Sequence, residues 1–257
     1  MRDELDSSRS KAPAVKRAAK MLWNLSRHPE GQTLSEISRE LDLVPSSALH
    51  ILRELVNSGL VSIRGKRYCL GRANLTLAHR LYRADEFIRD STRLMEDITQ
   101  KLGVFAISSE LERDRIIVCA TSNVPKSIWP DAQPGKRLPA LSSATGRLVA
   151  ACSVKAAAEL KQQFDRVVWG RRPDFTHWLH EVARSRQSGV ALDDGDFQPD
   201  LAIFSAPIFS KQPAAKRFVS LGIHKSCLDE DARLNLPIAV KSLARELSSV
   251  ARRHVIQ

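Results

Sequence analysis

Small polar and basic side chains that could bind a DNA duplex occur close together in one stretch of the sequence. Ser46, Ser47, His50 and Arg53 fall within a segment whose apolar residues have helical spacing. Hydroxyl, imidazole and guanidinium groups can hydrogen-bond to base edges and phosphates when a helix lies in the major groove. A cationic run, Arg64-Gly65-Lys66-Arg67, follows in the same stretch. These residues are the candidate DNA contacts, with Gly65 as the turn between them.

Two short helices are predicted to hold these side chains. Thr33 and Glu36 have the spacing of a capping box, in which each side chain accepts a hydrogen bond from the backbone amide of the other residue. Pro45 suits the first turn of a second helix, because an amide in that turn has no intrahelical partner. Gly59 suits the left-handed residue that ends it. Apolar residues at helical spacing predict the buried faces, which are Leu34, Ile37 and Leu41 in the first helix and Ala48, Ile51, Leu52 and Leu55 in the second.

A β-hairpin is predicted directly after the second helix. Val61, Ile63, Tyr68 and Leu70 fall on alternating positions on either side of the cationic run. Two helices and a hairpin in this order are typical of a winged helix-turn-helix, in which the hairpin, or wing, contacts the sugar-phosphate backbone. The same elements also occur in ordinary α+β cores. The basic hairpin tip and the net charge of +11 favour the DNA-binding interpretation.

Length and composition indicate a globular protein with two domains. The 257 residues are enough for two hydrophobic cores. No apolar run approaches the roughly 18 residues of a membrane helix, and the first residues lack the apolar core of a signal peptide. We therefore expect a cytoplasmic protein without membrane contacts. The 4 cysteines are far apart and form no C-x-x-C pair, so we expect reduced thiols rather than disulfides or zinc ligands.

Changes in residue pattern divide the chain into four parts. Residues 1–13 are polar and are predicted to be a mobile arm. Residues 14–72 are the predicted winged helix-turn-helix domain, with one further helix before Thr33. Residues 73–102 are a predicted helical linker, interrupted near residues 84–86, with an apolar side available to a second copy of the chain. Residues 103–257 mix strand and helix patterns, which predicts an α+β domain with one antiparallel sheet, large enough to enclose a ligand. The predicted strands are 104–111 and 115–120, which form a hairpin, and 190–192, 201–209 and 217–224. A proline-rich loop is predicted from residue 125 to 139, and a closing helix from about residue 230 to 253.

Three segments resemble the IclR family of bacterial transcription regulators. LVPSSALHILRELVNSGLV keeps the family's small polar pair, Ser46 and Ser47. PGKRLPALSSATGRLVAA is similar to the family's glycine-containing segment, with Gly146 beside the basic Arg147. SGVALDDGDFQPDLAIFSAPIF ends in the family-like Ala206-Pro207-Ile208. The resemblance covers nearly the whole chain from residue 14, and it implies an N-terminal winged helix-turn-helix, a helical linker and a GAF-like effector-binding domain.

The resemblance also implies a ligand site in the second domain. Asp193, Ile203 and Ser220 fall at positions similar to effector contacts in family members, and many members have a cysteine where this chain has Ile203. The site is therefore expected to suit an organic acid with an apolar or aromatic body. Its carboxylate would bind backbone amides near residues 142–144, at the start of a predicted helix. The candidate effector-binding residues are Ser142, Ser143, Ala144, Asp193, Ile203, Ser205 and Ser220.

Each of these residues also has a purely structural interpretation. Asp193 can cap a turn, Ser220 can be an ordinary strand residue, and Ile203 can belong to the core. Departures from the family pattern limit what can be transferred. His50 stands where members often have arginine, so their base preference does not carry over, and the run from residue 195 to 200 replaces a usual glutamate and glycine.

Patterns for catalysis, metals and cofactors are weak. His177 and His180 are three residues apart, but no third ligand of matching type lies nearby in the sequence. Asp193 and Asp194 have no positioned nucleophile, and residues 135–146 have neither Walker A nor dinucleotide-binding spacing. We expect no metal, no cofactor and no enzymatic activity.

The sequence thus predicts a homodimer or homotetramer that binds double-stranded DNA at a pseudo-palindromic operator and responds to a small organic acid. Two alternatives remain open at this point. One is a DNA-bound scaffold whose second domain receives a protein partner, for which the altered run at 195–200 is the support. The other is an enzyme that turns over a small acid.

Overall fold

The structure is a computed structural model that describes residues 11–123, 132–210 and 215–253. The chain forms two compact units, Met1–Ala84 and Asp85–Gln257. Most of the predicted N-terminal arm, residues 1–10, lies outside the described residues.

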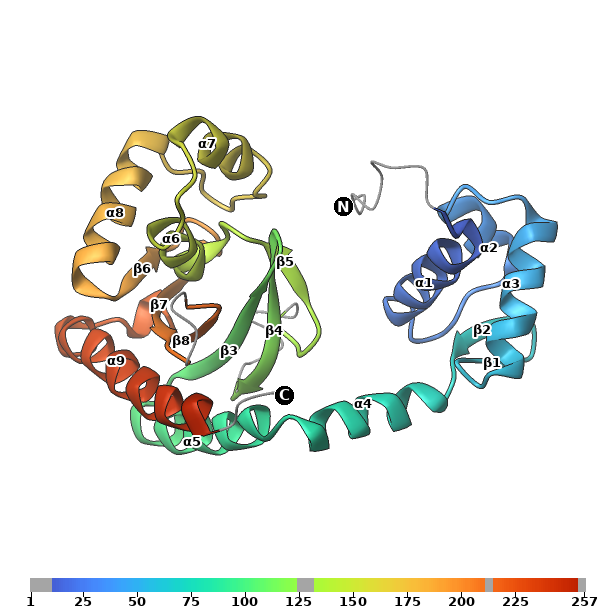
Figure 1. Cartoon of the computed structure of the whole chain (residues 1–257), viewed down its shortest axis with the longest axis horizontal. Coiled ribbons are helices and arrows are strands. Elements are labelled where there is room, and N and C mark those ends of the chain that lie inside the picture. The colour runs from blue at the N-terminus through green and yellow to red at the C-terminus, as the bar shows by residue number, and fades with distance from the viewer. Residues whose placement is uncertain (1–10, 124–131, 211–214, 254–257) are drawn as a thin grey trace. The chain divides into compact units, whose positions relative to one another are not determined.

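The N-terminal unit contains three helices, a hairpin and a fourth helix. The helices are α1 (Pro13–Ser26), α2 (Leu34–Glu40) and α3 (Pro45–Asn57), and the hairpin consists of β1 (Val61–Arg64) and β2 (Arg67–Leu70). Helix α4 (Ala73–Ala84) follows (Figure 1). Side chains from α1, α2, α3 and β1 form its core, which is made of Met21, Leu25, Ile37, Ala48, Leu52, Leu55 and Val61.

The predicted local signals of this unit are confirmed. Thr33 and Glu36 form the capping box, with the Thr33 amide donating to Glu36 Oε2 at 2.7 Å and the Glu36 amide donating to Thr33 Oγ1 at 3.3 Å. Pro45 lies in the first turn of α3. Gly59 has a φ of +72°, in the left-handed region that suits glycine after a helix.

The C-terminal unit is built on one antiparallel sheet with strand order β5-β4-β3-β8-β7-β6. Its hairpin of β3 (Phe105–Glu112) and β4 (Arg115–Ser122) was predicted, as were β6 (Ala191–Asp194), β7 (Leu201–Ile208) and β8 (Arg217–His224). The edge strand β5 (Arg137–Pro139) falls in a segment predicted to be a loop. It pairs with β4 from Arg115 to Ile117, and Pro139 together with the prolines before the strand explains why the pattern indicated a loop.

Helices cover both faces of this sheet (Figure 1). Helices α5 (Glu86–Leu102) and α9 (Glu230–Arg253) cover one face, and the core between them and the sheet includes Phe87, Met95, Phe204, Val240 and Leu247. Helix α6 (Ser143–Ala151) lies on the opposite face, and α8 (Phe175–Ser188) packs against α6. Helix α7 (Ala157–Asp165) and the 3-10 helix η1 (Lys225–Cys227) complete the unit. The fold is therefore α+β, as predicted.

The long helices of both units are amphipathic rather than uniformly apolar. In the described part of the chain, no helix combines the length and hydrophobicity needed to cross a bilayer.

Candidate nucleic-acid interface and ligand site

Helix α3 has one face in the core and one in solvent. Ala48, Leu52 and Leu55 are buried in the N-terminal unit. The predicted contacts Ser46, His50 and Arg53 are exposed, and Ser47 is half-buried. The amides in the first turn of a helix have no intrahelical acceptors, and no side chain of residues 11–123 forms a capping hydrogen bond with this helix. The start of α3 therefore presents hydrogen-bond donors to a polar or anionic partner.

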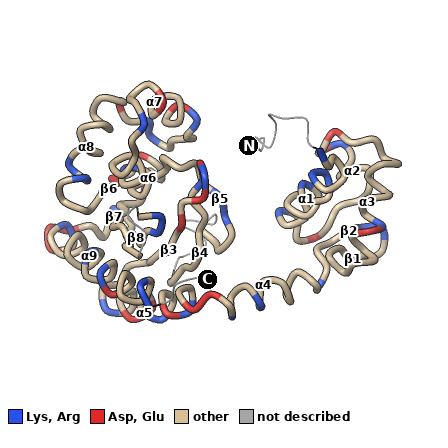
Figure 2. The backbone as a smooth tube through the Cα atoms, viewed as in Figure 1, with Lys and Arg blue, Asp and Glu red and all other residues tan. Residues whose placement is uncertain are grey.

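The wing carries the predicted cationic run at its tip. Gly65 and Lys66 form the turn, and Arg64 pairs with Arg67 across the hairpin. Arg64 and Lys66 are exposed, and Figure 2 shows basic residues at this hairpin and along α1. Arg67 differs from the other two cations because its Nη1 donates to Gly31 O at 2.9 Å and to Glu36 Oε2 at 3.3 Å.

A small cavity lies between α6 and the sheet of the C-terminal unit. Its volume is about 20 Å³, which is room for about one water molecule. The walls combine apolar residues from the strands with hydroxyl groups from α6 and β8. They are Ile107, Ser109, Ile116, Val118, Leu138, Ser142, Ser143, Thr145, Ile203 and Ser220.

Two serine hydroxyls at the start of α6 are unusual. Ser142 Oγ and Ser143 Oγ are buried and have no hydrogen-bond partner among the described residues. Ser143 has a φ of +58°, a left-handed conformation that costs energy in a residue with a Cβ atom. Within the described parts of the chain, no side-chain hydrogen bond caps α6 at Ser142. The cavity is thus bordered by polar groups whose hydrogen-bonding capacity is unused in this structure.

Three further hydroxyls form a closed triangle beside the cavity. Thr145 Oγ1 lies 3.2 Å from Ser205 Oγ and 3.2 Å from Ser220 Oγ, and the two serine oxygens lie 2.7 Å apart. All three side chains are buried. Thr145 comes from α6, whereas Ser205 and Ser220 are opposite each other on β7 and β8. The triangle therefore joins the helix to the sheet at the edge of the cavity.

The predicted effector residues divide into two groups. Ser142, Ser143, Ile203 and Ser220 line the cavity. Ala144 is buried in the adjacent core, and Ser205 lies behind Ser220 in the hydroxyl triangle. The sequence prediction missed the lining residues of β3, β4 and β5 and Thr145. Strand alternation could have shown which residues share a face, but not that this face meets α6.

Asp193 does not line the cavity but belongs to a buried ion cluster. Arg147 of α6 is 1% exposed in its side chain and pairs with Asp193 at 3.4 Å, Asp196 at 2.6 Å and Glu181 at 2.8 Å. Asp193 Oδ1 also accepts the amides of Asp196 and Phe197, which is the turn-capping role considered from the sequence. Burial raises the pKa of the Asp193 carboxyl, and the nearby Arg147 guanidinium opposes this shift.

His177 and His180, the pair weighed as metal ligands, do not form such a site in the structure. His177 Nε2 lies 3.7 Å from Glu181 Oε1 on the same helix. Among the residues that the structure describes, no group of three or more potential ligands is arranged around a metal position.

Comparison with known families covers both units. Residues 14–63 match the IclR helix-turn-helix domain, and residues 81–249 match the bacterial transcriptional regulator IclR C-terminal domain. The chain belongs to the IclR family of transcriptional regulators. It is therefore a DNA-binding protein of the helix-turn-helix type, as the exposed face of α3 indicates.

Individual IclR-family relatives are distant. The chain is 24% identical to the HTH-type transcriptional regulator BhcR of Paracoccus denitrificans, over 85% of this chain and 80% of the relative. It is 25% identical to the Pca regulon regulatory protein of Pseudomonas putida, over 80% of this chain and 73% of that protein. Identity at this level is consistent with family membership, but it transfers no individual ligand contact.

Solved structures of the family share the fold. A transcriptional regulator from Alicyclobacillus acidocaldarius aligns with a TM-score of 0.79 at 22% identity, over 94% of this chain and 100% of that one. An IclR homologue from Microbacterium hydrocarbonoxydans, solved in complex with 4-hydroxybenzoate, aligns with a TM-score of 0.74 at 18% identity, over 92% of this chain and 99% of that one.

Proposed function

We propose that this IclR-family chain binds a pseudo-palindromic operator as a homo-oligomer and that a small organic acid controls the binding. The exposed polar start of α3 beside a basic wing is the observation that carries the DNA-binding part. Ser46, Ser47, His50 and Arg53 would contact base edges or adjacent phosphates. Arg64 and Lys66 would contact phosphates and fix the register of the protein on the duplex.

Helix α4 supports association with a second copy. None of its side chains is buried, and Leu75, Leu77 and Leu81 are exposed large apolar residues. Exposed apolar side chains gathered on one helix are typical of a protein interface. Two copies would place two recognition helices in major grooves about one helical turn, or a multiple of it, apart.

The ligand part of the proposal depends on the cavity beside α6. An organic carboxylate would accept hydrogen bonds from the first-turn amides of α6 and from the unused hydroxyls of Ser142 and Ser143. Its apolar body would lie against Ile107, Val118 and Ile203. Asp193 and Ser205 would act indirectly, by holding Arg147 and Ser220. The complex of a family member with 4-hydroxybenzoate supports an acid of this class.

An aromatic acid does not fit the cavity in its present state. A volume of about 20 Å³ holds a single water molecule, so the walls must separate on binding. The short edge strand β5, which contributes Leu138, pairs with only one other strand and is the wall that can move at the lowest cost. Ligand binding would then control DNA binding only through different affinities for the two protein conformations.

The DNA-binding proposal is tested by selecting preferred duplexes from a random library and titrating them at several salt concentrations. Lys66→Gln should weaken selected and random duplexes alike and lower the salt slope by about 0.9, the value for one phosphate contact. Ser47→Ala should instead alter the selected sequence. Lys155→Gln, in the C-terminal unit, is the control for loss of one positive charge. No preference of the wild-type chain for any duplex would refute the proposal.

The ligand proposal is tested by calorimetric titration with 4-hydroxybenzoate, benzoate and acetate. Binding of the aromatic acids and not of acetate is expected, and Ile203→Asp should abolish it by placing a charge against the carboxylate and the ring. Binding of acetate alone would overturn the assignment. The alternative of a protein partner gains no support from residues 195–200, because Asp196 of that run pairs with Arg147 and Arg171 inside the unit.

A further inference from the structure

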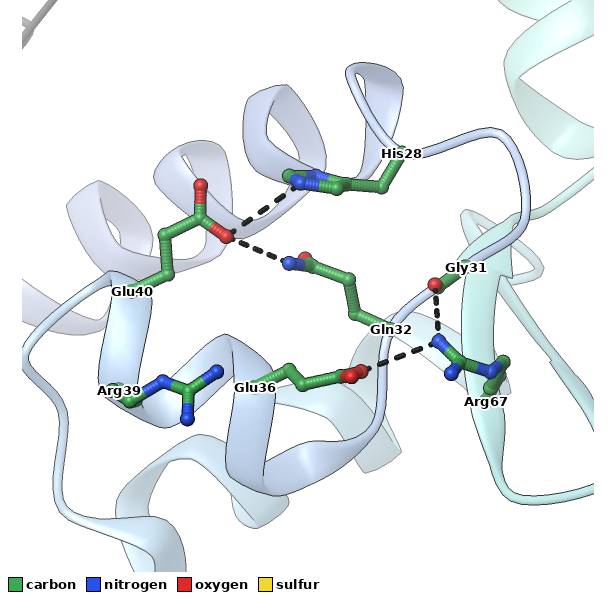
Figure 3. Close-up of a pocket in the computed structure, with 7 residues that line it drawn as sticks. All are labelled: His28, Gly31, Gln32, Glu36, Arg39, Glu40 and Arg67. Carbon is green, nitrogen blue, oxygen red and sulfur yellow. Dashed lines mark hydrogen bonds and ion pairs between the residues drawn. The ribbon is translucent and has the colours of Figure 1, made fainter.

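Arg67 is a wing cation that forms an ion pair within the N-terminal unit. All three basic side chains at the wing tip are exposed, but Arg64 and Lys66 have no ion-pair partner among the described residues. Arg67 instead contacts Gly31 O and Glu36 Oε2 through one nitrogen. We name Gly31, Glu36 and Arg67 the wing clasp. Figure 3 shows these three residues at one end of a groove in the N-terminal unit.

We propose that Arg67 is a positioning residue for DNA binding, and that it acts by fixing the wing to the start of α2 rather than by contacting a phosphate. This inference rests on the proposed DNA-binding function. It changes the role predicted for Arg67 from the sequence, and it assigns a role to Glu36, a carboxylate that by charge alone would oppose DNA binding.

Glu36 connects the wing to the helix-turn-helix. Its Oε2 accepts the Thr33 amide at 2.7 Å as part of the capping box and also accepts Arg67 Nη1 at 3.3 Å. The hydrogen bond from the Thr33 backbone lowers the pKa of Glu36, and the Arg67 charge lowers it further, so the carboxylate stays ionised at neutral pH. Glu36 Oε2 therefore accepts hydrogen bonds both from the residue that caps α2 and from Arg67, the first residue of β2.

The segment before α2 provides the second fixed point. The Gln32 amide donates to Tyr68 O at 3.0 Å, and the Tyr68 amide donates to Gln32 O at 2.7 Å. Gly31 has a φ of +77°, and a Cβ atom there would lie 2.5 Å from Cys69 Sγ and 2.8 Å from Tyr68 O. The chain at Gly31 thus lies directly on β2, which brings the Gly31 carbonyl to Arg67.

Further hydrogen bonds in the groove hold Gln32 in place. Gln32 Nε2 donates to Glu40 Oε2 at 2.7 Å, and Nδ2 of the buried Asn24 side chain donates to Gln32 Oε1 at 2.6 Å. His28 Nε2 lies 3.7 Å from Glu40 Oε2. The groove, about 440 Å³ in volume, also includes Arg39 (Figure 3). Because α2 packs against α3, fixing the wing to α2 also fixes it relative to the recognition helix.

The decisive test is the sign of the effect of Glu36→Gln on affinity for a random-sequence duplex. Glutamine can keep the capping-box bond but loses the charge that holds Arg67. If the clasp positions the wing, affinity falls by about threefold although a negative charge has been removed, in line with the strength of an exposed ion pair. If Arg67 is a phosphate ligand held back by Glu36, affinity rises and the salt slope steepens, which would overturn the inference.

Matched variants distinguish a positioning role of Arg67 from a general effect of net charge on DNA affinity. Glu30→Gln removes an exposed carboxylate from the loop before α2 without touching the clasp, and its affinity should stay level or rise slightly. Arg67→Gln should weaken binding with little change in salt slope, whereas Lys66→Gln should lower the slope by about 0.9. The double variant Glu36→Gln/Arg67→Gln should bind no more weakly than Arg67→Gln alone, since the two residues act as one unit.

Circular dichroism melting of each variant confirms that the N-terminal unit is folded before its affinity is interpreted. Additive losses in the double variant, or a salt slope for Arg67→Gln that falls as far as that of Lys66→Gln, would overturn the inference. If the wild-type chain shows no salt-dependent binding to duplex DNA, the proposed function itself fails, which is a different result from any of these.

Discussion

Each unit of the chain contains an arginine bound to carboxylates, and the two sites differ mainly in solvent exposure. Arg67 is 47% exposed in its side chain and its partner Glu36 is 37% exposed. Arg147 is 1% exposed, and its partner Asp193 is completely buried. Exposed pairs contribute little to stability, whereas breaking a buried pair leaves an unsatisfied charge in a medium of low polarity. Burial therefore makes the Arg147 cluster the stronger contributor to stability, whereas the Arg67 pair contributes little energy and suits the positioning role proposed for it.

The largest effect is expected from breaking the buried cluster. Arg147→Met should lower the free energy of unfolding of the C-terminal unit by about 3–5 kcal/mol, because three carboxylates lose their shared partner. Urea denaturation measures this, followed by the fluorescence of Trp169 and Trp178 in a background where the other two tryptophans, Trp23 and Trp129, are replaced by phenylalanine. Arg184→Met is the control, since Arg184 pairs with Glu181 on the surface at 3.6 Å. Equal losses of unfolding free energy in the two variants would show that burial of an ion pair does not determine how much it stabilises the unit.

A smaller effect is expected from the uncharged buried network in the same unit. Thr145→Val keeps the shape of the side chain but removes one corner of the hydroxyl triangle, while Ser205 and Ser220 remain bonded to each other. The expected loss in the free energy of unfolding is about 1 kcal/mol, measured by the same denaturation. Thr92→Val, which removes a hydroxyl bonded only to a carbonyl of its own helix, should have less effect. A loss as large as that of Arg147→Met would contradict the ranking.

The clasp should contribute less to stability than either buried network. Arg67→Gln should lower the free energy of unfolding of the N-terminal unit by less than about 1 kcal/mol, because both partners are substantially exposed. Hydrogen exchange of the α2 and α3 amides measures this unit separately from the other. A loss of several kcal/mol would show that the clasp is chiefly a structural element of the fold.

The smallest predicted effect concerns pH. The pKa of Glu36 is lowered in the folded state, so its ionised form stabilises the fold above its ordinary value of 4.5, and this stabilisation is lost as the pH falls through the folded pKa. The stability difference between wild type and Glu36→Gln should therefore be constant near neutral pH and shrink in acid. Hydrogen exchange or urea denaturation at neutral and acidic pH tests this, with Glu30→Gln as the control. A stability difference that grows in acid would mean that folding raises the pKa of Glu36 rather than lowering it.

Structural features that depend on residues close together in the chain could be predicted from the sequence. The capping box at Thr33 and Glu36, the proline that starts α3, the wing hairpin and the limits of α9 all depend on neighbouring residues, and the structure confirms them. Strand β5 was missed because Pro139 and the prolines before the strand indicate a loop, and only the pairing with β4 makes these residues a strand.

The interactions that define the sites were less accessible from sequence. Asp193 was assigned to the ligand, yet it binds Arg147, which lies 46 residues earlier in the chain. The partners Arg67 and Gly31 are separated by 36 residues. No periodicity or motif specifies such pairs, because they form only when separate elements pack together. The exposed or buried state of a charged side chain likewise depends on the tertiary packing.

The hydroxyl triangle of Thr145, Ser205 and Ser220 has a property that its oxygen positions do not reveal. Each hydroxyl can donate to either neighbour, so the three protons can circulate in one sense or the other without moving a heavy atom. While the ring is closed, in either sense, Ser220 donates inside it and offers a visiting molecule a lone pair. If the Ser220 proton turns toward the visitor instead, Ser220 becomes a donor and the ring loses one of its hydrogen bonds. The same rigid scaffold could therefore accommodate guests of opposite hydrogen-bonding polarity, and neutron diffraction of a complex would show which orientation a given guest selects.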